Sequence, residues 1–171
     1  MRPRVLIALL ALLVVASVGS LQASAGAGDV FRARLDGYQE APLTLSVPGT
    51  GTFRAQLSAD GGSLSYRLRY SDLTGPALFA HIHLGRPATA GGVIAFLCDS
   101  TEDAPPGVPE CPGAGGTVTG TIEPDDVVGP EGQGISAGEF DELVAALRAR
   151  ATYANVHTEL FQPGEIRGDI T

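Results

Sequence analysis

The chain has 171 residues, and its 11 basic residues, all arginine, stand against 19 acidic residues to give a formal net charge of −8. This balance argues against nucleic acid as a partner, because gripping a phosphate backbone takes clustered cations. Metal ions and other proteins remain compatible partners. The 23 glycines, 12 prolines and 6% aromatic residues favour short strands joined by turns.

Residues 1–25 have the pattern of a secretory signal peptide. Two early arginines precede an apolar run from Val5 to about Ala16, and small residues ending in ASA at 23–25 follow it. The run is shorter than the roughly 20 residues of a membrane-spanning helix, so we expect cleavage; a retained N-terminal anchor is the alternative. The sequence therefore predicts a secreted protein with no membrane span in the mature chain.

Alternating apolar and polar residues predict an all-β fold. In VFRARLD, which begins at Val30, every second residue is apolar. Residues 53–57 and 64–70 alternate in the same way on either side of the turn sequence ADGG, so they predict a β-hairpin. Further strands are predicted in ALFAHIHLG, GGVIAFLC, GTVTGTIEP, ATYANVHTEL and GEIRGDIT.

One helix and two loops interrupt the strands. The helix is expected near 137–150, where Ser136 and Glu139 have capping-box spacing and the apolar residues recur on one face. We expect it to cover an open end of the sheets. The loops at 99–116 and 123–134 are rich in acidic residues, and they are candidate surfaces for recognising an extracellular protein.

Cys98 and Cys111 are the two cysteines of the chain. Exported proteins meet oxidising conditions, so we expect these residues to form a disulfide, with two free thiols as the alternative. The bond would close a loop of about 14 residues, which contributes on the order of 3 kcal/mol in the chain-entropy treatment.

The three histidines form the main candidate site. His81 and His83 share one face of a predicted strand because alternate side chains of a strand point the same way. His157 has the matching parity in its own strand, so we expect all three imidazoles on the outward face of the sheet. If these strands are close neighbours, the imidazoles converge into a zinc or copper site, which Glu40 could complete. The alternative is that the histidines hydrogen-bond loops folded across the strands.

Motifs for other chemistry are absent from the sequence. It contains no G-x-S-x-G, no G-x-G-x-x-G and no P-loop. A non-enzymatic binding or structural module is therefore favoured. A mononuclear copper or zinc enzyme, redox or hydrolytic, is the alternative.

The segments AHIHLGRPATAGGVIAFLC and YANVHTELFQPGEIRGDI, together with LDGYQEAPLTLSVPGTGTFRAQL near the start, resemble the CHRD domain first described in chordin. The resemblance covers residues 29–171 and implies a single extracellular β-domain without established catalytic residues. A weaker likeness to copper/zinc superoxide dismutase, which also carries an H-x-H strand, supports a Greek-key sandwich or barrel. The positions that match the CHRD motifs are Glu40, His81, His83, Asn155, His157, Glu165 and Arg167.

Three of these positions are polar residues in the closing segment. Asn155 is expected to hydrogen-bond a neighbouring loop or to orient a histidine. Arg167 has the same strand parity as Glu165, and it either forms a structural ion pair or clamps an anion. These residues are predicted either to have a structural role or to orient the histidines.

Overall fold

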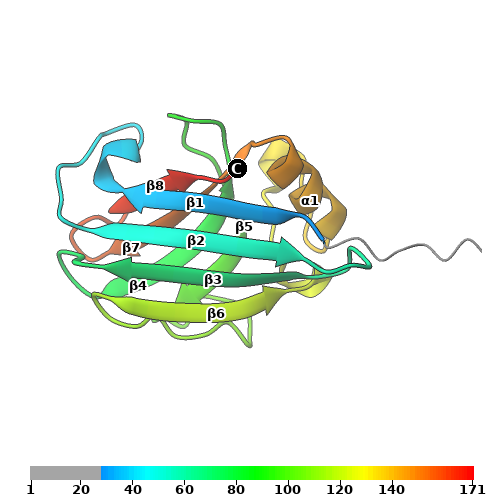
Figure 1. Cartoon of the computed structure of the whole chain (residues 1–171), viewed down its shortest axis with the longest axis horizontal. Helices are drawn as coiled ribbons and strands as arrows, with labels where there is room; N and C mark the ends of the chain where they lie inside the picture. Colours follow the sequence, from blue (N-terminus) through cyan, green and yellow to red (C-terminus); the bar gives the residue numbers. More distant parts are fainter. Residues whose placement is uncertain (1–27) are drawn as a thin grey trace, which may run out of the picture.

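The computed structural model describes residues 28–171, and the predicted signal peptide at 1–25 lies outside them. Eight antiparallel strands form one sheet in the order β5-β4-β7-β8-β1-β2-β3-β6 (Figure 1). The strands are β1 (Val30–Asp36), β2 (Thr50–Leu57), β3 (Leu64–Ser71), β4 (Ala77–Leu84), β5 (Val93–Asp99), β6 (Gly116–Ile122), β7 (Thr152–Thr158) and β8 (Ile166–Asp169). Three 3-10 turns, η1 (Gly37–Gln39), η2 (Pro124–Asp126) and η3 (Glu131–Gln133), lie in the connections.

The sheet bends over into two layers and nearly closes on itself. The two strands at the ends of the order, β5 and β6, contact each other. Around this seam the spatial order is β7-β4-β5-β6, in which a fourth strand returns beside the first, and this is a Greek key. The predicted all-β Greek-key sandwich or barrel is confirmed.

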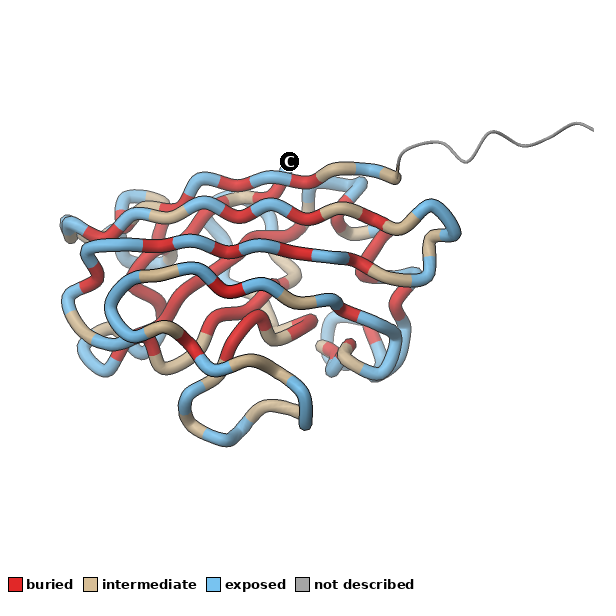
Figure 2. The backbone as a smooth tube through the Cα atoms, turned by 60° about the horizontal axis from the view of Figure 1, so that its bottom comes forward, coloured by how far each residue is buried: buried red, intermediate tan, exposed pale blue. Residues whose placement is uncertain are grey.

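Alternation along the strands builds the core between the layers. Strand β3 is buried at every second residue, and β1 and β2 follow the same period (Figure 2). The predicted hairpin is confirmed, since Leu57 of β2 pairs with Leu64 of β3. Strand β7 differs because both of its faces are buried over its whole length. A second set of residues must therefore cover the outer face of β7.

The helix α1 (Phe140–Arg148) covers one end of the layers, as predicted (Figure 1). Its buried residues are Phe140, Leu143, Val144 and Leu147. The helix begins one residue after Glu139, which is its N-cap, so Ser136 does not cap it as the spacing predicted. The Glu139 carboxylate still accepts a hydrogen bond from the Ser136 amide at 2.7 Å. Among the described residues, none of the helices has the length and apolar character needed to cross a membrane.

The predicted disulfide between Cys98 and Cys111 is confirmed, and it ties β5 to the loop that follows it. We expect the double variant Cys98→Ala/Cys111→Ala to lose about 3 kcal/mol of unfolding free energy, because a loop of this length is constrained only in the oxidised chain. Urea unfolding of the variant and of reduced wild-type protein measures the loss. A change below about 0.5 kcal/mol in both samples would contradict this expectation.

Candidate metal centre

The three histidines meet on one face of two neighbouring strands. Strands β4 and β7 are antiparallel partners, with Phe79 opposite His157 and His81 opposite Asn155. The ring centroid of His81 lies 5.3 Å from that of His83 and 5.1 Å from that of His157. One ligand nitrogen from each ring lies within 4.8 Å of the other two. The expected convergence of the imidazoles is therefore present.

The rings lie on the outward face of the sheet, as predicted, but that face is not exposed to solvent, because loops fold across it and hydrogen-bond two of the histidines as the alternative interpretation expected. His81, His83 and His157 are only 6%, 7% and 5% exposed. They do lie on the side of the strands opposite to the core residues Ala80 and Ile82, but the segments around 85–92 and 161–164 fold across them. Strand parity gives the face of a sheet, whereas burial depends on what the rest of the chain places over that face.

Two of the rings are held by backbone carbonyl groups of these covering segments. Nδ1 of His83 lies 3.0 Å from the carbonyl oxygen of Gly91, and Nδ1 of His157 lies 2.8 Å from that of Gln162. A carbonyl oxygen only accepts, so each Nδ1 carries the proton and each Nε2 keeps a free lone pair. This hydrogen bond is the one that usually orients a metal-ligating histidine.

The remaining ring nitrogens have no protein partner within residues 28–171. The Nε2 atoms of His83 and His157 and both nitrogens of His81 are buried and unpaired. His81 lies between two aromatic rings, stacked on Phe79 at 5.0 Å and edge-on to Phe96 at 4.4 Å. Burying an unpaired polar nitrogen costs free energy, so the cluster points to a ligand, and a single metal ion would use three of these four atoms, one from each ring.

Burial keeps all three histidines neutral at physiological pH. It lowers the pKa of His83 and of His157 to about 4. For His81, burial and the repulsion that the other two rings would exert on its charged form lower the pKa to about 2. Neutral imidazoles are the form that binds a metal ion.

His83, Tyr153 and Arg167 form a stack in which the Tyr153 ring packs against the His83 ring. The ring of Tyr153 is parallel to that of His83 at 4.8 Å, and the guanidinium carbon of Arg167 lies 3.5 Å from the centre of the Tyr153 ring. The Tyr153 hydroxyl accepts a hydrogen bond from the Gly91 amide at 3.1 Å. The stack therefore fixes both the ring and the segment that orients it.

Arg167 is fully buried and binds the covering segment directly. It donates to the carbonyl oxygens of Thr89 at 2.8 Å and of Arg86 at 3.0 Å, and it forms an ion pair with Asp169 at 3.3 Å. These contacts occupy both terminal nitrogens of its guanidinium group. The geometry is that of a clamp on a loop of the protein itself.

Glu40 is not one of the residues that the structure brings within ligand distance of the three histidines. It is buried, and burial raises the pKa of its carboxyl group to about 7, although Arg167 and Asn155 partly offset this. A Cβ atom on Gly164 would fall 2.7 Å from its Oε2 and 2.4 Å from the Asn155 side-chain amide. Glu40 and Asn155 therefore pack together against the bare backbone of Gly164.

Glu165 is also buried but serves a different contact. Its carboxylate accepts hydrogen bonds from the amide and hydroxyl of Thr74 and from the hydroxyl of Thr158, each at 2.8 Å. These bonds tie the start of β8 to the end of β7 and to the segment after β3.

Aromatic residues that surround the histidines were not among the site residues predicted from the sequence, although strand parity places Phe79 on the face of His81 and His83. Phe79, Phe96 and Tyr153 all contact an imidazole ring. Phe79 shares the parity of His81, and Tyr153 shares that of His157, so the pattern contained a signal for both. Phe96 comes from β5, and the pairing of β4 with β5 contains two register shifts. Because of these shifts, the alternation of residues along each strand does not predict that Phe96 lies opposite His81.

Comparison of the chain with curated proteins and with solved structures finds no significant match. The family model of the CHRD domain matches residues 31–170, which include all three histidines and every strand apart from Val30, the first residue of β1. That span also contains Glu40, Asn155, Glu165 and Arg167, the other positions at which the sequence resembles the family. The chain therefore belongs to the CHRD domain family.

Proposed function

We propose that this CHRD domain is an extracytoplasmic binding module that holds one copper or zinc ion through His81, His83 and His157. The observation that carries the proposal is the cluster of buried, unpaired and neutral imidazole nitrogens. Export through residues 1–25 is part of the proposal, and the disulfide is consistent with it because such bonds persist in oxidising compartments.

The cluster has the chemistry of a transition-metal site. Imidazole suits copper and zinc, and three histidines bound through nitrogen are a known zinc ligand set. Ligand atoms about 2.0 Å from one ion would lie roughly 3.3–3.5 Å apart. The present separations are up to 4.8 Å, so the ligand atoms would approach one another by up to about 1.5 Å on binding. The ion would supply positive charge to the otherwise unpaired lone pairs.

Burial favours holding an ion over processing a substrate. The unpaired histidine nitrogens are closed off from solvent, and Phe79 and Phe96 flank His81. A hydrolytic zinc site needs an open position for water and substrate. We therefore favour a metal-binding module over a mononuclear metalloenzyme. Recognition through the acidic loops has less support, since Asp99 and Asp126 accept hydrogen bonds within their own loops.

Metal analysis of the protein purified without a histidine tag tests the proposal. After loading with Cu²⁺, Cu⁺ or Zn²⁺ and desalting, we expect close to one equivalent of at least one of these ions. The variant His157→Ala should bind that ion more than about 100-fold more weakly, because it removes one of three ligands. Less than a tenth of an equivalent of every ion in the wild-type protein would refute the proposal.

Glu40→Gln is the matched control for this measurement. It changes another buried polar residue of the same region, but Glu40 lies outside the three-histidine cluster. We expect its affinity for the ion to change less than about threefold. A loss comparable to that of His157→Ala would instead make Glu40 a fourth ligand.

A further inference from the structure

Five arginines lie on one outer face of this acidic domain. Arg32 and Arg34 of β1, Arg54 of β2, and Arg67 and Arg69 of β3 are all exposed, at positions that alternate with buried core residues. We call them the arginine face. The chain has 11 basic residues in all, so almost half of them lie on three adjacent strands. The net negative charge of the sequence conceals this cluster.

The strand register sets the arginines side by side. Arg32 pairs with Arg54, and Arg54 pairs with Arg67, so three cations form a row across the sheet. Neighbouring strands are about 4.8 Å apart, and like charges that face each other at this distance are destabilising. In a second row, Arg34 and Arg69 lie on either side of Thr52.

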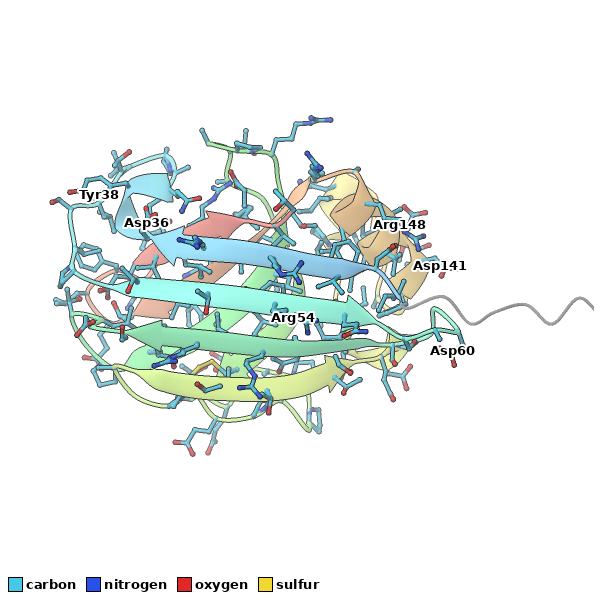
Figure 3. The ribbon with its side chains drawn as sticks, viewed as in Figure 1. Asp36, Tyr38, Arg54, Asp60, Asp141 and Arg148 are labelled. Carbon is cyan, nitrogen blue, oxygen red and sulfur yellow. A yellow bond between two sulfur atoms is a disulfide. The ribbon has the colours of Figure 1, made fainter. Side chains whose placement is uncertain are left out.

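Carboxylates do not neutralise these rows. Among residues 28–171, the ion pairs are Arg148 with Asp29 and Arg167 with Asp169, and neither involves the arginine face. Arg54 contacts only the amide of Gln56, at 3.4 Å. In Figure 3, Arg54 lies over the middle of the front layer, whereas Asp36, Asp60 and Asp141 lie toward its ends. Asp36 and Asp169 line the grooves beside these rows, but none of the five arginines has a carboxylate of the described residues within ion-pair distance.

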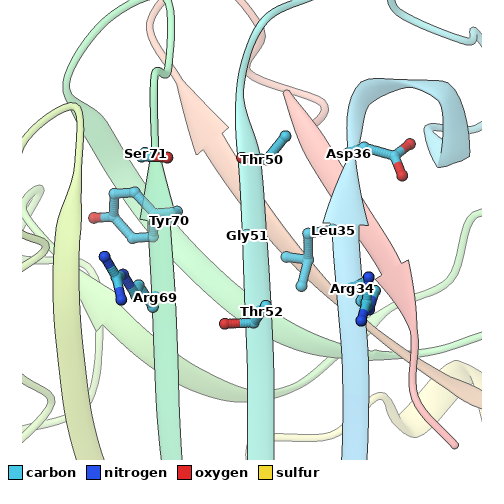
Figure 4. A pocket seen from close by; sticks show the side chains of 9 residues that line it. All are labelled: Arg34, Leu35, Asp36, Thr50, Gly51, Thr52, Arg69, Tyr70 and Ser71. Carbon is cyan, nitrogen blue, oxygen red and sulfur yellow. The ribbon is translucent and has the colours of Figure 1, made fainter.

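Hydroxyl groups surround the arginines. The exposed residues on this side of β2, β3 and β6 include Thr50, Thr52, Ser65, Ser71, Thr117, Thr119 and Thr121. Two adjoining open grooves of about 480 and 560 Å³ run over the same strands, and both are lined by Arg34 and Thr52. Figure 4 shows the first of them, with Arg34 and Arg69 flanking Thr52. The face offers cations and hydroxyl donors along a continuous track.

We propose that the arginine face binds a linear acidic polysaccharide that carries carboxylate groups along its length. Guanidinium groups recognise carboxylates through paired hydrogen bonds. The threonine and serine hydroxyl groups of the face can hydrogen-bond the hydroxyl groups of the sugar. A lipid surface fits less well because Val30 is the single apolar side chain at the outward positions of these strands. Single-stranded nucleic acid fits less well because those positions carry no aromatic ring for base stacking. The proposal is independent of the metal centre.

Binding of polygalacturonate to the full mature domain tests this inference, with neutral dextran as the reference polymer. The variant Arg54→Gln/Arg67→Gln should weaken binding of polygalacturonate at least about tenfold. It should also reduce the slope of log affinity against log salt concentration by about 1.4 or more, because two charge contacts are lost at roughly 0.7 or more each. The matched control is Arg86→Gln/Arg150→Gln, which removes two exposed arginines outside the face and should change the affinity less than twofold.

The midpoint of thermal unfolding distinguishes loss of binding from misfolding of a variant. Arg67→Glu places an acid opposite Arg54, so it should raise the midpoint of thermal unfolding while abolishing polygalacturonate binding. Equal loss of binding in both double variants would overturn the proposal. So would absence of binding to polygalacturonate, or tighter binding to vesicles containing phosphatidylglycerol or to an oligonucleotide.

Discussion

Acidification from pH 6.5 to about 4 is expected to destabilise the metal-free domain by several kcal/mol. The reason is the burial of three neutral histidines, whose pKa values lie at about 4 for His83 and His157 and about 2 for His81. Over most of this range the unfolded chain binds protons at its histidines and the folded chain does not; His83 and His157 begin to take up protons in the folded chain only as the pH approaches 4. Each such group lowers the unfolding free energy by up to about 1.4 kcal/mol per pH unit.

Glu40 contributes with the opposite sign. Its pKa is raised to about 7 in the folded state, so the folded chain holds a proton that the unfolded chain has released. This contribution is fully present below the ordinary pKa of a glutamate and is lost as the pH rises to 7. The three histidines outweigh the single carboxyl group, so the net effect between pH 6.5 and 4 is acid destabilisation. Glu40→Gln should make that loss steeper.

Urea unfolding at half-unit steps from pH 4 to pH 8, in the presence of a chelator, measures this dependence. The variant His81→Leu removes one titrating ring and fills its place with an apolar side chain between Phe79 and Phe96. It should lose less stability than the wild-type protein between pH 6.5 and 4. Loading with the bound metal should shift the acid transition to lower pH, because the ion competes with protons for the same nitrogens. A flat pH profile in the metal-free wild-type protein would show that the rings are not buried as described.

Replacement of Arg167 by alanine is expected to cost about 3 kcal/mol or more of unfolding free energy. The guanidinium group is 1% exposed, and its loss would leave the carbonyl groups of Arg86 and Thr89 and the carboxylate of Asp169 without their donor. It would also remove the cation stacked on Tyr153. The cost comes from the loss of the hydrogen bonds to the two backbone carbonyls, from the loss of the stacking on Tyr153, and from the space that a large buried side chain leaves behind. The Asp169 side chain is 30% exposed, so water can solvate it in the variant.

Arg148→Ala is the matched control for Arg167→Ala. Arg148 also forms an ion pair, with Asp29 at 2.8 Å, but both side chains are half exposed at 58% and 50%. Exposed pairs of this kind contribute roughly 0–1 kcal/mol. Urea unfolding compares the two variants, and hydrogen exchange at Thr89 and Gly91 reports whether the covering segment is released. Similar losses in both variants, with unchanged exchange, would rule out the clamp.

The strands and the shared face of the histidines could be predicted because they follow from local geometry. Side chains alternate along any strand, so His81 and His83 must point the same way, and the parity of His157 could be set against its apolar neighbours. The same rule contained the arginine face, since Arg32, Arg34, Arg54, Arg67 and Arg69 all alternate with buried residues. The net charge of the chain gave no indication of an acidic ligand for this face, because a total charge does not say where the individual charges lie.

The sequence by itself determined the period of each strand, the hairpin, the capping helix and the disulfide, because these depend on neighbours a few residues apart or on the only two cysteines present. Only the tertiary structure decided that the histidines are buried. Their cover depends on contacts across the fold: Arg167 reaches Arg86 and Thr89 about 80 positions earlier, and Gln133 reaches the Gly92 amide. Such contacts form once strands distant in sequence are paired, and no local pattern of residues encodes which loop then closes over which face.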